Sequence, residues 1–163
     1  MAQVVLNQNQ FAQTPVLGQV SMVVNPDIVP ARINPSSSAV FQAGSAVKLI
    51  SGTANEILVD ACTGPTDGPV FGVIVYNLRK NLLSAGDVAS VACGGSYVFL
   101  EASAAITRGD KVTASAATTG NDPRIATVST PSTQYVTGVA VDSAAGAGSL
   151  IRIKIAPSFN GAV

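Results

Sequence analysis

The chain has 163 residues, of which 47% are hydrophobic, and its nine basic and nine acidic side chains give a formal charge of zero with no histidine present. This composition excludes a disordered chain, and dispersed cations argue against a nucleic-acid partner, because phosphate binding needs clustered Lys and Arg. Charged residues make up only 11% of the chain, against roughly a quarter in an average protein, which indicates that much of the surface contacts other protein; a neutral Ser, Thr and Ala surface is the alternative.

Residues 1–36 are expected to form an extended N-terminal arm. The first 26 residues carry no charge, and Pro15, Pro26, Pro30 and Pro35 leave room for edge strands at most, around residues 18–24. Gln, Asn, Gly and Pro interrupt every apolar run, so neither a transmembrane helix nor a signal peptide is expected. The apolar side chains of the arm must pack on the chain's own body or on a neighbouring subunit: Phe11, Val16, Leu17, Val20, Met22, Val24 and Ile28.

Residues 37–163 are expected to form one β-rich domain. Short runs rich in Val, Ile and Tyr alternate with Gly, Pro, Asn, Asp and Ser, the pattern of an all-β sandwich or small barrel. Helix is scarce, with one turn conceivable in residues 100–109. The predicted strands are 46–51, 56–62, 70–77, 87–93, 96–102, 110–116, 124–129, 135–142 and 149–156.

Three blocks of sequence occur twice in this domain. The pairs are AGSAV (43–47) with RGDKV (108–112), GVIVYN (72–77) with GVAVDS (138–143), and AGDVASVAC (85–93) with AGSLIRIKI (147–155). Their glycines are 65, 66 and 62 positions apart, and an offset this constant favours a duplicated β unit over chance. The two copies cover about 42–93 and 107–156, although sequence rich in Ala, Gly and Val inflates such matches.

The third block predicts which side chains face inward. Ile151, Ile153 and Ile155 alternate with Arg152 and Lys154, so the isoleucines are expected to face the core. Their counterparts in the first copy are Ala89, Val91 and Cys93. Both copies of this third block open with Ala-Gly followed by Asp or Ser, which predicts a tight turn: glycine permits a positive φ, and the short oxygen side chain accepts a backbone N–H.

The loop at 77–84 is longer in the first copy than its equivalent in the second. Gly72 and Gly86 are 14 positions apart, Gly138 and Gly148 only 10. The longer loop combines apolar side chains with the only two adjacent cations of the chain, and it can either contact a partner or fold onto its own barrel. Its candidate contact residues are Leu78, Arg79, Lys80, Leu82 and Leu83.

No catalytic, metal or cofactor site is expected. Without histidine, Ser-His-Asp and Cys-His catalysis are excluded, and Cys62 and Cys93 cannot complete a zinc site and are expected to be reduced, buried hydrophobic side chains. The nine acidic residues are scattered and single out no carboxylate pair. The RGD at 108–110 aligns with AGS, so it is expected to be a turn rather than a receptor motif.

The repeated Gly-[Asp/Ser]-x-Val, Gly-Val-x-Val and Ala-Gly-[Asp/Ser] blocks resemble the small decoration (cement) proteins of tailed-bacteriophage capsids, over about residues 42–156. This resemblance implies a non-enzymatic homotrimer, made in the host cytoplasm, that binds the major capsid protein on the outer surface of an icosahedral shell and stabilises it. In such families an N-terminal arm often touches the capsid or the adjacent subunit. Two other functions stay open: a carbohydrate-binding or host-attachment module of the virion, which would need exposed aromatic side chains, and a hydrolase with a dispersed carboxylate pair.

Overall fold

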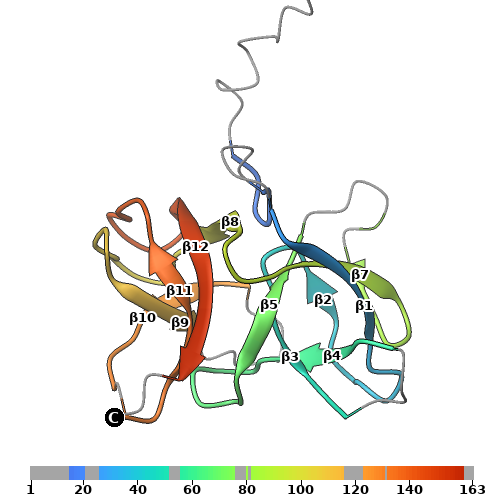
Figure 1. Ribbon diagram of the computed structural model, residues 1–163. Helices are drawn as coiled ribbons and strands as arrows, with labels where there is room; N and C mark the ends of the chain where they lie inside the picture. Colours follow the sequence, from blue (N-terminus) through green and yellow to red (C-terminus); the bar gives the residue numbers. More distant parts are fainter. Residues whose placement is uncertain are drawn as a thin grey trace, which may run out of the picture.

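The computed structural model describes residues 15–20, 26–51, 56–75, 80, 82–115, 123–130 and 132–159. The described part of the chain contains strands and no helix, arranged as two β bodies side by side (Figure 1). The strands are β1 (Ile28–Ile33), β2 (Phe41–Gln42), β3 (Ala46–Leu49), β4 (Leu58–Ala61), β5 (Val70–Ile74), β6 (Leu82–Leu83), β7 (Val88–Ala92), β8 (Tyr97–Glu101), β9 (Lys111–Ala114), β10 (Ile125–Thr127), β11 (Tyr135–Ala140) and β12 (Leu150–Phe159).

The two bodies have the same strand order. In the first half, five strands form a closed barrel in the order β1-β4-β3-β5-β7, and β2 and β6 form a separate two-stranded sheet. The second half, β8 to β12, is a sheet in the order β10-β9-β11-β12-β8. If β1, β3, β4, β5 and β7 are matched with β8, β9, β10, β11 and β12, every neighbour in one half has its counterpart in the other. The parallel pair Ile33–Val59 that closes the barrel even has an equivalent in the parallel bridge between Ala102 and Ile125.

The repeated blocks occupy equivalent places in these halves. Gly44 and Gly109 both have a positive φ, and each donates its N–H to the end of the matching strand, to Ile74 O and to Ala140 O, at 2.8 Å in both cases. The short oxygen side chain that follows each glycine accepts a backbone N–H across the turn, at 3.1 Å in the first half and 2.9 Å in the second. The RGD segment is therefore a turn, as predicted.

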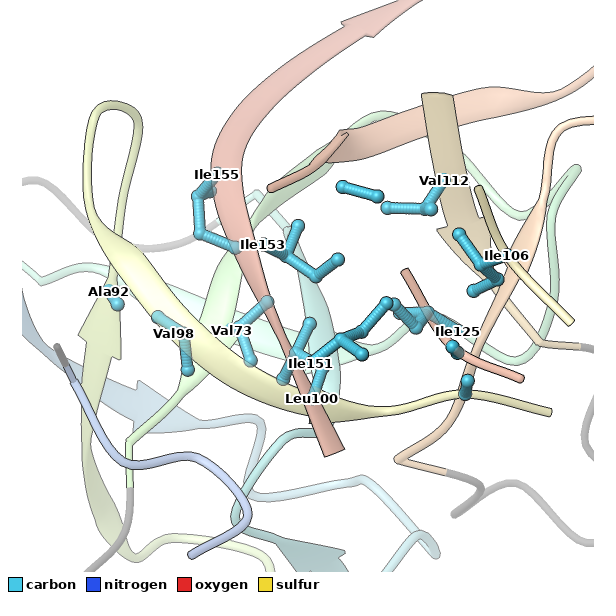
Figure 2. Packing of buried hydrophobic residues seen from close by; sticks show 13 residues of the cluster. Val73, Ala92, Val98, Leu100, Ile106, Val112, Ile125, Ile151, Ile153 and Ile155 are labelled. Carbon is cyan, nitrogen blue, oxygen red and sulfur yellow. The ribbon is translucent and has the colours of Figure 1, made fainter. Parts of the chain in front are cut away.

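Each half has its own apolar core, and the two cores meet. The cores contain the inward-facing residues predicted from the third block: Ala89, Val91 and Cys93 in the first half and Ile151, Ile153 and Ile155 in the second are all at most 7% exposed. Val73 and Ala92 of the first half pack into the core of the second half around the β12 isoleucines (Figure 2). The halves therefore share one hydrophobic body.

All nine predicted strands are present, but the expected end of the arm at residue 36 was too late. β1 is one of the strands that form the barrel wall. It is antiparallel to β7, and Ala31 and Ile33 are buried. Pro30 is compatible with this position because hydrogen bonds to β7 come from alternate residues, as at Asp27 and Ile33, so the nitrogen of Pro30 faces away from β7. The proline therefore removes no bond of this ladder. The helical turn conceivable in residues 100–109 is replaced by the end of β8 and a bridge from Ile106 to Ala144.

Candidate interaction surface

Residues 15–20, the described root of the arm, lie on the edge of β8. Gly18 donates to Phe99 O at 2.8 Å, Phe99 donates to Gln19 O at 2.9 Å, and Val20 forms an antiparallel bridge with Val98. A Cβ on Gly18 would lie 2.7 Å from the Cβ of Ala43, and its φ is +72°, so glycine is required here on both grounds. Residues 16–19 form a turn, in which Gln19 donates to Val16 O at 2.9 Å, and the segment adds two backbone hydrogen bonds and one bridge to the edge of β8.

Leu17 extends this contact to the first half. Its Cδ1 lies 2.8 Å from the point that a Cβ of Gly44 would occupy, and the Cβ of Pro123 lies 3.3 Å from the same point. Gly44 belongs to the first half and Pro123 to the second, so the segment joins the two halves. For Leu17 and Val20, which are partly buried, the packing seen is on the chain's own body.

The other predicted contact residues of the arm divide into two groups. Val16 is 44% exposed and Ile28 42% exposed, which leaves both side chains available to a partner. Phe11, Met22 and Val24 lie outside the described residues, and so do Leu78 and Arg79 of the long loop.

At the described end of the loop 77–84, one leucine is exposed and the next is buried in the core. Leu82 is 56% exposed, whereas Leu83 is 4% exposed and pairs with Phe41 in the core of the first half. Leu83 is therefore not available as a contact, because its strand, β6, alternates outward and inward like any other. Lys80 is exposed and forms an ion pair with Asp87.

Sequence reasoning missed a group of exposed aliphatic side chains on the first half. Leu49 is 54% exposed, Ile57 38% and Val88 64%. Strand register places Val88 opposite Arg32 on the outer face of the barrel. Leu49 is instead opposite the buried Val59, so Leu49 and Ile57 lie on the inward-facing side of their strands and are exposed where the barrel ends. The alternation in 87–93 could have identified Val88; Leu49 and Ile57 lie at strand ends, where alternation does not predict exposure.

We define the first-half patch as Val88 together with Ile28 and Pro30, which lie on the outer face of β1 and β7. The charge of Arg32, which is opposite Val88 on this face, is neutralised within the chain, because Arg32 NH1 lies 3.2 Å from Glu56 Oε1. All large hydrophobic side chains that are exposed in the described residues belong to residues 16–88. The patch is thus apolar, uncharged in sum and confined to one of the two halves.

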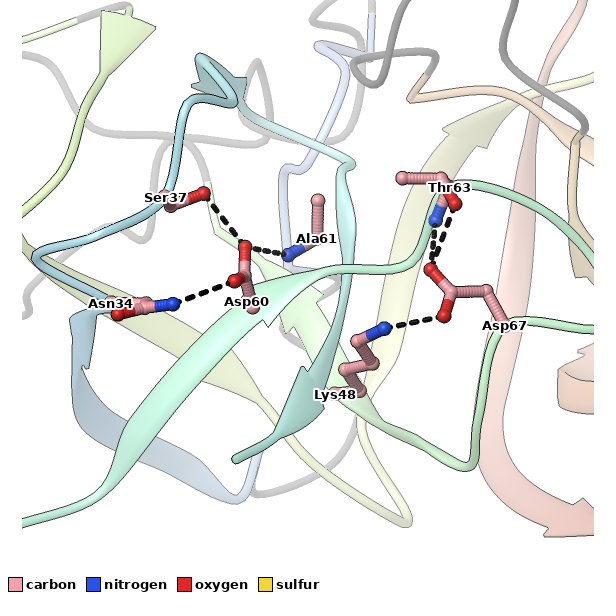
Figure 3. A network of polar contacts seen from close by, with 7 residues as sticks. All are labelled: Asn34, Ser37, Lys48, Asp60, Ala61, Thr63 and Asp67. Carbon is pink, nitrogen blue, oxygen red and sulfur yellow. Dashed lines mark hydrogen bonds and ion pairs between the residues drawn. The ribbon is translucent and has the colours of Figure 1, made fainter. Parts of the chain in front are cut away.

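A polar network supports the barrel beside this patch (Figure 3). Burial raises the pKa of the Asp60 carboxyl, but hydrogen bonds from Asn34 Nδ2 at 2.9 Å and from Ser37 Oγ at 2.7 Å outweigh it, and the pKa is lowered overall. The pKa of Asp67 is likewise lowered: its ion pair with Lys48 and its hydrogen bonds from Thr63 outweigh the effect of burial. Both carboxylates fix loops onto the barrel, which is a structural role.

The Asp142–Arg152 pair and the two cysteines also have structural roles. Arg152 donates to both carboxylate oxygens of Asp142, at 2.7 and 2.8 Å, and this pairing lowers the pKa of Asp142. Cys62 and Cys93 are free and buried, and burial raises the pKa of the Cys62 thiol to about 12. A thiol with such a pKa is a poor nucleophile.

The described residues present neither a metal-binding cluster nor a membrane-spanning helix. No group of three or more His, Cys, Asp or Glu side chains within these ranges is placed to hold a metal ion. Among the same residues, no helix has the length and hydropathy needed to cross a membrane.

Comparisons with known proteins agree with this architecture. No curated protein matches the sequence. A solved structure described as the crystal structure of the head fiber gp8.5 N base in bacteriophage phi29 superposes with a TM-score of 0.50 at 20% identity, covering 80% of this chain and 94% of that one; at this identity the likeness concerns the fold. The family model described as phage cement protein matches residues 41–155, well over half of the chain and both halves of the duplicated body. The chain therefore belongs to the phage cement protein family.

Proposed function

We propose that this protein binds the outer surface of an icosahedral phage capsid as a homotrimer and stabilises the shell without catalysing a reaction. The observation that carries the proposal is the family match across residues 41–155, which makes the chain a structural protein of a phage virion. The structurally similar protein of bacteriophage phi29 is the base of a head fiber, which is consistent with a place on the phage head.

The surface of the molecule supports this function. A cement protein binds tightly through many weak contacts. Each trimer contacts several capsid subunits, and once one contact has formed, the high effective concentration favours the others, so the overall affinity exceeds that of any single contact. Exposed aliphatic side chains such as Leu82 and Val88 suit such contacts. Because the ion pairs of the surface are formed within the chain, we expect binding to the capsid to depend weakly on salt.

Binding to undecorated phage heads tests the proposal. Purified protein should sediment with heads that lack it and raise the temperature at which they release DNA. The variant Leu82→Asp should bind less tightly, and Ala145→Asp, a matched charge at an exposed position of the second half, should bind like the wild type. Failure of the wild-type protein to bind heads, or binding without any gain in their thermal stability, would contradict the function.

The carbohydrate-binding alternative makes a different prediction. Of the tyrosines that could stack on a sugar, Tyr97 and Tyr135 are partly buried, and Tyr76 lies outside the described residues. Glycan binding that is lost in Tyr97→Ala, with head binding unchanged, would favour an attachment module over a cement protein.

A further inference from the structure

The chain itself shows how the end of one of its β bodies is covered. Ala114 lies at the end of β9 and is 3% exposed. It packs in one cluster with Ala46, Cys62 and Val70 of the first half. Ala46 is on the outer face of β3, because the next residue, Val47, points into the barrel core. The end of the second half therefore sits against the outer wall of the first half.

The equivalent end of the first half is exposed. Leu49 ends β3 as Ala114 ends β9, since Val47 is aligned with Val112 in the first repeated block. Leu49 is nevertheless 54% exposed, and Ile57 on the same side of the neighbouring strand is 38% exposed. We call Leu49 and Ile57 the barrel-end surface. It leaves large aliphatic side chains in water at a place where the second half has a buried alanine.

The first-half patch continues the wall that covers the second half. Ile28 is opposite Ala92 on β7, and Ala92 packs into the core of the second half. From Ile28 onward the wall is exposed: Val88 is 64% exposed, and Pro30 is exposed as well. This part of the wall is apolar, like the part that already covers the end of a β body.

The corresponding wall of the second half is a poorer partner for a barrel end. The repeated blocks place Lys111 at the position of Ala46 and Lys154 at the position of Ala92. Both lysines are exposed, and burying their charge against aliphatic side chains would cost free energy. An apolar barrel end therefore fits the first-half patch better than it fits this wall.

We propose that the barrel-end surface of one subunit packs on the first-half patch of the next, and that this contact closes the homotrimer. The inference rests on the proposed homotrimer and names the surfaces that join its subunits. A cyclic trimer needs two different surfaces on each subunit, because each of its contacts is head-to-tail. The barrel-end surface and the first-half patch are two such surfaces. This contact uses Val88 and leaves Leu82, which belongs to neither surface, for the capsid.

Arg32 connects the two surfaces within each subunit. It is opposite Val88 on β7, and its backbone N–H donates to Ile57 O at 2.8 Å. The surfaces therefore adjoin, an arrangement that lets both face one three-fold axis. Arg32 NH1 lies 3.2 Å from Glu56 Oε1, so the charge between the surfaces is neutralised within the chain.

Cysteine cross-linking tests the proposal once sedimentation has established the oligomeric state. In the trimer, L49C/V88C should oxidise to covalent dimers and trimers. Because the contact is head-to-tail, L49C alone and V88C alone should stay uncross-linked, whereas the two single variants, co-expressed, should form covalent dimers. The control V88C/A145C combines the patch with an exposed position of the second half and should not cross-link. Oxidised wild type shows whether the buried Cys62 and Cys93 contribute.

The outcomes separate this inference from the function it rests on. A trimer in which L49C/V88C stays uncross-linked, closes within one chain, or links no better than V88C/A145C would overturn the contact and leave the capsid function standing. Efficient self-linking of either single variant would overturn the head-to-tail arrangement. A monomeric wild-type protein would overturn the trimer itself.

Charged substitutions give a second measurement. Leu49→Asp and Val88→Asp should each raise the dissociation constant of the trimer by about tenfold or more, whereas Ala145→Asp should leave it unchanged. Both replaced side chains are more than half exposed, so the body should stay folded, which a thermal melt checks. If Leu49→Asp leaves the trimer intact but abolishes binding to phage heads, the barrel end faces the capsid and the proposal is wrong.

Discussion

The glycines that open the two Gly-Val blocks occupy positions where the fold leaves no room for a side chain. A Cβ on Gly138 would lie 2.3 Å from Lys154 O and 2.9 Å from Ile153 Cγ2, and one on Gly72 would lie 2.4 Å from Ala92 O. Neither glycine has a positive φ, so the obstacle to alanine is steric. Each also lies at a shift in strand register, where neighbouring backbones come close.

The expected cost of Gly138→Ala follows from what the methyl group meets. Inserting a methyl group into a well-packed core costs about 1–3 kcal/mol. The main obstacle here is a backbone carbonyl, which cannot rotate away as a side chain can, so we expect the upper end, about 3 kcal/mol. In a domain of this size each kcal/mol lowers Tm by ~2–4 °C, which predicts a fall of about 6–12 °C. Gly72→Ala should behave alike, because it meets the equivalent carbonyl.

Thermal melts of matched glycine variants test this reasoning. A Cβ on Gly146 would meet nothing within 4 Å and its φ is ordinary, so Gly146→Ala should melt within ~2 °C of the wild type. Gly109 is equally open but has a φ of +94°, so Gly109→Ala isolates the conformational cost, about 1 kcal/mol. If Gly138→Ala melts like the wild type, or if Gly146→Ala is equally damaging, the close approach of the strands is not what requires glycine.

Three further predictions concern other parts of the body. The pKa of Asp60 in the folded protein lies below its ordinary value of 3.8, so its stabilising effect is present above about pH 4 and lost as the pH falls further; Asp60→Asn should melt lower at pH 7 and lose less Tm between pH 5 and pH 3, and parallel curves would refute this. Phe41 is 1% exposed, so Phe41→Ala should lower the free energy of unfolding in urea by about 3–5 kcal/mol, against less than ~0.5 kcal/mol for the exposed Leu82→Ala; equal losses would contradict the assigned core. Gly18→Ala should release residues 15–20 from β8 and speed hydrogen exchange at the Phe99 amide without slowing or speeding exchange at the buried Val91 amide; unchanged exchange at Phe99 would show that glycine is not needed there.

Most of the strands and the duplication could be predicted from sequence patterns. Short runs of β-forming residues between turn residues identified all nine of the strands expected, and the spacing of Gly44 from Gly109 predicted equivalent turns. These patterns did not find β1, because Pro30 reads as a break in any strand whose two neighbours are unknown. Only the register with β7 shows that the nitrogen of Pro30 faces away from the ladder.

The candidate contacts were less predictable than the core. Hydrophobicity selected Leu82 and Leu83 alike, yet one is 56% exposed and the other 4%, because a two-residue strand sends adjacent side chains to opposite faces. Leu49 and Ile57 were not selected, because they look like ordinary members of buried strands. Their exposure depends on where the barrel ends, and strand pairing alone sets that.

The sequence by itself determined that this chain is an all-β protein with a doubled unit, no histidine chemistry and few surface charges, since these properties depend on residue types and their local spacing. Only the tertiary structure shows which of the two equivalent strands, β1 or β8, has its edge covered by another segment. Among the described residues, segment 15–20 lies on the edge of β8, whereas Ile28 and Pro30 on the matching strand β1 are exposed, because contacts between distant strands determine which apolar side chains are left in water.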